Sequence, residues 1–63
     1  MITKAQLDIP FKDFEPGADN PQTPREFTRE SEREFDMPHA DLDNMSEEAI
    51  NKHLDFLDYL WTK

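Results

Sequence analysis

Cysteine is absent from this chain of 63 residues, so disulfide bonds and thiolate metal sites are excluded. Valine is absent as well, and the only β-branched aliphatic residues are Ile2, Ile9 and Ile50, which argues against a sheet-based core. No apolar run approaches the ~20 residues that span a bilayer, and the N-terminus lacks the apolar stretch of a signal peptide. We therefore expect a cytoplasmic protein without a membrane-spanning segment.

Positive charge is scarce, because seven Lys and Arg residues stand against fifteen Asp and Glu residues and leave a net charge of −8. Nucleic-acid backbones and anionic membranes attract the opposite sign, so neither is an expected direct partner. A basic protein surface would be attracted instead. The alternative is that the charge serves only to keep the molecules in solution.

Residues 1–22 are predicted to form an extended arm that ends in a turn-rich loop. Leu7, Ile9 and Phe11 alternate with other residues at the period of an extended segment. The stretch 15–21 is dense in turn-forming residues and contains the only glycine of the chain. Large apolar side chains on this arm either fold back on the rest of the chain or dock on another protein. We expect them to fold back, because a free arm with such groups would be sticky.

A helix is predicted over about 24–36. Thr23 at the N-cap, Pro24 at the first helical position and Glu26 three residues after the cap form a strong start signal. The helix is mostly charged, with rows of arginines and of glutamates at a spacing of four residues. A narrow apolar seam is expected at Phe27, Ser31 and Phe35. The charged rows are either solvated or turned toward a partner.

A second helix is predicted over about 45–62, with Asn44 or Ser46 as its N-cap. Its apolar side chains fill an arc of roughly 160°, which is wide for a surface helix. The members of this arc are Ala49, Ile50, His53, Leu54, Phe56, Leu57, Leu60 and Trp61. A chain this short buries only about 60% of its unfolded surface, so it has little material to cover such an arc.

The predicted fold is therefore mostly α. An extended N-terminal arm over 1–22 precedes a two-helix unit over 23–63, packed as a small helical hairpin and forming a single small domain. We expect His53, inside the apolar arc, to be packed and hydrogen-bonded.

Catalytic and metal-binding chemistry is not expected. His39, Asp41 and Asp43 bring three possible ligands together, but an EF-hand loop needs further ligands and a glycine that this stretch lacks. We expect the two aspartates to act in turn formation and helix capping instead. So small a chain cannot readily enclose a pocket that separates the pKa values of two carboxylates. We expect no enzyme activity, no metal and no cofactor.

The sequence points instead to a protein that acts by binding another protein. Aromatic residues dominate interface hot spots, and acidic residues suit a basic partner. The expected partner-binding residues are Phe11, Phe14, Glu26, Glu30, Glu34, Asp55, Phe56, Asp58, Tyr59 and Trp61.

The favoured function is that of an inhibitor or regulator, of the kind encoded by phages and mobile elements. It would act as a DNA mimic by occupying a basic, nucleic-acid-binding surface of a larger protein. The alternative is a small accessory subunit of a larger complex, held in a groove by the apolar face of the C-terminal helix. A homodimer is a third way to cover the same face.

Overall fold

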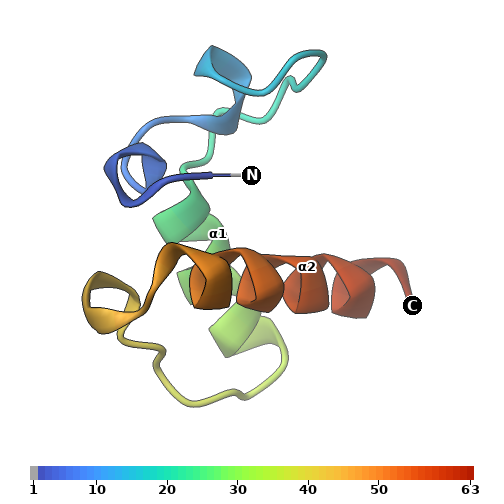
Figure 1. The fold of residues 1–63 in the computed structure, drawn as a ribbon. Helices are drawn as coiled ribbons and strands as arrows, with labels where there is room; N and C mark the ends of the chain where they lie inside the picture. The colour runs from blue at the N-terminus through green and yellow to red at the C-terminus, as the bar shows by residue number, and fades with distance from the viewer. Residues whose placement is uncertain (1) are drawn as a thin grey trace.

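The N-terminal segment, two α-helices and the turns between them are held in one body in the computed structural model, which describes residues 2–63 (Figure 1). The elements in chain order are the 3-10 turns η1 (Lys4–Gln6) and η2 (Phe11–Asp13), α1 (Pro24–Glu34), the 3-10 turn η3 (Leu42–Asn44) and α2 (Glu47–Thr62). The described residues contain no strand. The predicted architecture is confirmed: the fold is mostly helical, α1 and α2 pack against each other, and an N-terminal stretch precedes them. In Figure 1, α1 passes behind α2 at a steep angle.

Helix α1 begins with the predicted capping box. The Glu26 N–H donates to the Thr23 hydroxyl oxygen at 3.1 Å, and the Thr23 N–H donates to the Glu26 carboxylate at 2.9 Å. Two orphan donors at the helix start are thus satisfied reciprocally, and Pro24 adds a preset φ at the first position.

The end of α1 lies two residues before the predicted end. Asp36 adopts a left-handed φ of 52°, and the Met37 N–H turns back to the Glu32 carbonyl at 2.8 Å. This is the hydrogen bond of a Schellman turn, in which a left-handed residue stops the helix. The chain therefore leaves the helix at Phe35, ahead of the proline that the sequence suggested as the stop signal.

Helix α2 begins after Ser46, which settles the choice between the two predicted caps. The Ser46 hydroxyl accepts from the Ala49 N–H at 3.1 Å, and Glu47 and Glu48 lie in the first turn, where the helix dipole favours negative charge. Asn44 instead closes η3 and donates through its side chain to Asp41 at 2.5 Å.

The N-terminal segment folds back on α2, as expected. Ile2 and Leu7 are buried together with Leu42 and Ile50, and these four side chains form the core cluster. Asn51 of α2 fixes the register, because its side chain accepts from the Ile2 N–H at 2.8 Å and donates to the Ile2 carbonyl at 2.9 Å. The neutral amide of Asn51 thus pairs with both the N–H and the carbonyl of Ile2, as a neighbouring strand would in a sheet.

Within the N-terminal stretch, the alternating pattern at residues 7–11 does not correspond to a strand. Two 3-10 turns occupy much of this stretch, and Leu7 is buried while Ile9 is 39% exposed. The loop after η2 is closed by the N–H groups of Phe11 and Lys12, which donate to the carbonyls of residues 22 and 20 at 3.0 and 3.1 Å. Gly17 supplies the positive φ of 80° that the loop needs.

Small side chains line the most buried part of α1. Thr28 and Ser31 are fully buried, and their hydroxyls donate to the carbonyls four residues earlier at 2.9 and 2.8 Å. Those bonds remove the penalty of burying the hydroxyl groups. Within the predicted seam, Ser31 is buried, while Phe27 and Phe35, one turn before and one turn after it, are half-buried.

A charged clamp joins three parts of the chain. The Arg25 guanidinium of α1 binds Asp43 of η3 and Asp8 of the N-terminal segment, each at 2.8 Å. Its hydrogen bonds to Asp43 and Asp8 raise the pKa of Arg25, and the same contact with Arg25 lowers the pKa of Asp43. Both aspartates are largely exposed, so the clamp chiefly fixes geometry and adds little stability.

A second carboxylate, that of Glu32 on α1, is buried. It accepts from the Ala40 N–H at 2.6 Å and from the Arg29 guanidinium at 2.9 Å. Burial by itself raises the pKa of Glu32, but these hydrogen bonds outweigh it and hold that pKa below its usual value. The Arg29 guanidinium also donates to the Ala40 carbonyl at 2.9 Å, so this pair anchors the connector between the two helices.

Candidate partner-binding surface

The C-terminal half of α2 exposes aromatic side chains. Phe56 is 48% exposed and Tyr59, three residues later, is 57% exposed. Asp55 and Asp58 precede them on the same two turns and are also exposed. We call these four residues the outer face of α2. Exposed aromatic side chains next to carboxylates have the composition of a protein interface more than that of a solvated helix surface.

Trp61 differs from its aromatic neighbours because it is tied to α1. Its indole N–H donates to the Ser31 hydroxyl at 2.8 Å, and its ring meets Phe35 edge to face at 5.2 Å between centroids. The residue remains 42% exposed. Trp61 therefore joins the ends of the two helices and presents part of its ring beside the outer face.

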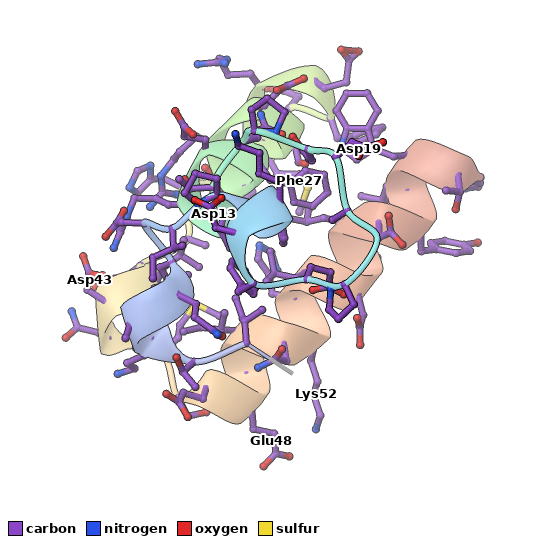
Figure 2. All side chains as sticks on the ribbon, turned by 90° about the horizontal axis from the view of Figure 1, so that it is seen from above. Asp13, Asp19, Phe27, Asp43, Glu48 and Lys52 are labelled. Atoms are coloured by element: carbon purple, nitrogen blue, oxygen red, sulfur yellow. The ribbon has the colours of Figure 1, made fainter. Side chains whose placement is uncertain are left out.

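A pocket of about 580 Å³ lies between the N-terminal loop and α2. Its lining combines apolar side chains from four parts of the chain with carboxylates from the loop and from α2. Asp55 and Asp58 belong to both the pocket and the outer face. In Figure 2, Phe27 is seen within the curve of the loop, while Glu48 and Lys52 project from α2 away from it.

Phe11 and Phe14, which were predicted to contact a partner, pack against other side chains of this chain. Phe11 meets Phe27 edge to face at 6.1 Å and packs beside Phe14 at 5.8 Å, and Phe14 rests against the core. Both side chains are half-buried, and Phe11 lines the pocket. Neither projects as a free anchor for a partner.

The acidic row of α1 splits into different environments. Glu26 is engaged in the capping box, and Glu30 accepts a hydrogen bond from the Gln22 side-chain amide. Glu34 is exposed at the end of the helix. The parallel row of arginines is largely neutralised, because Arg25 and Arg29 are bound to carboxylates. The charged edges of α1 thus serve the fold at several positions.

His39 and its neighbour Asp43 contact different partners. His39 Nδ1 lies 3.9 Å from Glu32, and Asp43 is held by Arg25. No group of three or more potential ligands in residues 2–63 is placed to hold a metal ion. His53 departs from the expectation of a hydrogen-bonded histidine: its Nε2 is buried and has no partner in the described part of the chain.

Two features of this surface were missed by reasoning from the sequence. The burial of Glu32 was not predicted, because its bond to the Ala40 N–H depends on the path of the connector. The pocket draws Glu15 and Asn51 together across 36 positions of sequence, and no local pattern signals such a contact.

Comparison with known protein families, curated proteins and solved structures finds no match to this chain. No helix within residues 2–63 has the length and apolar character needed to cross a lipid bilayer. The functional assignment therefore rests on the geometry and charge of the surface described above.

Proposed function

We propose that this protein is a non-enzymatic binding protein that uses the outer face of α2 to occupy a basic surface on a larger protein. The observation that carries the proposal is the exposure of Phe56 and Tyr59 on one helix, with Asp55 and Asp58 on the same turns. Aromatic side chains supply contact area at low entropic cost, and the carboxylates select the charge of the partner.

The net charge of −8 supports a basic partner. Surfaces that bind nucleic acid are rich in Lys and Arg, so an acidic protein can block them by presenting carboxylates where phosphates would lie. The proposed role is therefore that of an inhibitor or regulator of the phage or mobile-element type, acting in the cytoplasm as a DNA mimic. Like charges on two copies of this chain repel each other, which disfavours the homodimer.

The same aromatic side chains also support the second candidate function, that of an accessory subunit. In that case the apolar contact would provide the affinity, and the charge would serve only solubility. The two candidates differ in their response to salt, because screening weakens electrostatic attraction and leaves apolar contacts almost unchanged.

The test is affinity capture from the native host at two salt concentrations, with quantitative mass spectrometry. The wild-type chain is compared with the double variant Phe56→Ala/Tyr59→Ala. Ile9→Ala is the matched control, because Ile9 is another exposed apolar residue on a different segment. We expect a basic protein that is recovered by the wild type and the control, lost with the double variant, and reduced at high salt.

The proposal is wrong if every captured protein binds the double variant as well as the wild type. Recovery that depends on Phe56 and Tyr59 but is indifferent to salt would favour the accessory subunit.

A further inference from the structure

The pocket beside α2 combines apolar walls with a negatively charged rim. Its volume of about 580 Å³ suits a single large side chain with room to spare. The apolar walls are Ile2, Phe11, Phe27 and Leu54. The carboxylates of the rim are Glu15, Asp55 and Asp58.

The aromatic wall is held in place by its own packing. Phe27 of α1 presents its ring at 82° to that of Phe11, with 6.1 Å between centroids, and the Phe14 ring lies 5.8 Å from that of Phe11. A ring fixed in this way can pack against the aliphatic stem of a lysine or arginine and can attract the charged group through its π-face.

The rim carboxylates have no internal cation in the described chain. Among residues 2–63, no basic group lies within 4.0 Å of the carboxylates of Glu15, Asp55 or Asp58. The arginines of the first turns of α1 bind other carboxylates, and Lys52 pairs with Glu48 at 3.2 Å. An incoming cation therefore meets carboxylates that no basic group of residues 2–63 offsets within 4.0 Å.

We propose that this pocket accepts one basic side chain, a lysine or an arginine, from the partner protein. The inference rests on the proposed function and adds the chemistry of one contact to it. A protein side chain is favoured over a free cation because Tyr59 follows Asp55 by four residues and therefore lies beside it on the same side of α2. A partner segment that covers Tyr59 can thus also reach the pocket. The apolar walls would contribute nothing to a bare metal ion.

The direct test uses a short peptide as the probe and the full chain as the receptor. An arginine-centred pentapeptide, flanked by alanines and blocked at both ends, is titrated while NMR follows the side chains of Ile2, Phe27 and Leu54. We expect saturable shifts with a dissociation constant on the order of 1 mM, as suits a contact of one side chain. The same peptide with neutral citrulline in place of arginine is expected to give no saturable shifts.

The double variant Asp55→Asn/Asp58→Asn is expected to raise the dissociation constant of the arginine peptide about tenfold, since two charge contacts are removed. The matched control is Asp13→Asn/Asp36→Asn, which removes the same charge from exposed positions outside the pocket. The dissociation constant measured with that control should stay within about twofold of the wild-type value, as expected for screened charges at longer range. Circular dichroism confirms that both variants fold.

Equal weakening by both double variants would overturn the inference, because the peptide would then sense only the overall charge. Saturable shifts at the same side chains with Mg²⁺, or tighter binding of spermidine than of the peptide, would also overturn it in favour of a free cation. If the arginine peptide does not bind in the pocket while a partner is still captured through Phe56 and Tyr59, the proposed function stands without this contact. If the peptide binds but no partner is captured, the pocket stands and the proposed function fails.

Discussion

The two halves of α2 meet very different surroundings. In the N-terminal half, Ile50 is fully buried, and the Asn51 side chain bonds to both the N–H and the carbonyl of Ile2. The Glu47 carboxylate there accepts from the Lys4 N–H at 2.9 Å. In the C-terminal half, Leu57 is fully buried, but Phe56 is about half exposed although it belongs to the same apolar arc. One helix thus carries both a closed interior and an open aromatic surface.

The difference arises from what covers each half. The N-terminal segment and η3 fold over the first half, and the loop after η2 borders the pocket beside the middle of the helix (Figure 1, Figure 2). The far end packs against α1, to which Trp61 also bonds through the Ser31 hydroxyl. Large apolar side chains left exposed at one end of a small domain indicate a site for a partner more readily than a defect of packing.

The largest predicted effect comes from truncating a buried side chain in the N-terminal half of α2. Ile50→Ala should cost about 2–5 kcal/mol of unfolding free energy, because the site is fully buried and well packed. A domain of this size has only about 3–9 kcal/mol in total, so Ile50→Ala should remove a large share of its stability. Phe56→Ala on the open half should cost under about 0.5 kcal/mol. Urea denaturation followed by circular dichroism measures both, and equal costs would refute the contrast between the halves.

Glu32→Gln should have the next largest effect and lower the free energy of unfolding by about 1–3 kcal/mol. The reason is that the amide cannot satisfy both the Ala40 N–H and the Arg29 guanidinium as a carboxylate does. The lowered pKa of Glu32 contributes stability that is complete above the ordinary value of about 4.5 and is lost as the pH falls through the lowered value. Urea midpoints between pH 6 and pH 3 should fall less steeply in the variant. Parallel pH profiles would show that Glu32 carries no such linkage.

Trp61→Phe should cost about 1 kcal/mol, because it removes the hydrogen bond to Ser31 while keeping an aromatic ring near Phe35. Tyr59→Phe is the matched control, since it removes a polar group from an exposed aromatic residue in the same helix turn. We expect the control to leave the thermal midpoint unchanged. Hydrogen exchange at the C-terminal amides of α2 should quicken in the first variant alone.

The smallest predicted effect is a gain. Asp36→Gly should stabilise the fold by about 0.5 kcal/mol, because glycine adopts the left-handed φ of 52° without strain from a side chain. Asp36→Ala, which also removes the charge, should be destabilising by a similar amount. Thermal unfolding of the two variants separates the effect of the backbone from that of the charge.

The local signals in the sequence predicted the helices well. The start of α1 was marked by Thr23, Pro24 and Glu26, whose side-chain chemistry acts within one turn. The end of α1 was placed too late, because Asp36 is one of the few residue types that can take a left-handed φ and the sequence shows no glycine there. The start of α2 was narrowed to two positions, and packing of η3 decided between them.

The site was harder to predict because it depends on contacts between distant segments. The exposure of Phe56 follows from the wide apolar arc and the shortage of covering chain, while Tyr59 lies outside that arc. Phe11 looked equally available in the sequence, yet it packs against Phe27 once the N-terminal segment folds back. The fate of an aromatic residue outside an α-helix is set by where the loop closes, and that closure is made by the hydrogen bonds from the Phe11 and Lys12 N–H groups to the carbonyls of residues 22 and 20.

The most direct test of the central claim is the affinity of the captured partner for the purified chain as a function of ionic strength. We predict that the dissociation constant rises at least about tenfold between 50 and 300 mM salt, and that Asp55→Asn/Asp58→Asn flattens this dependence. A dissociation constant that stays constant across the range, in the wild type and the variant alike, would contradict recognition of a basic surface through the outer face of α2.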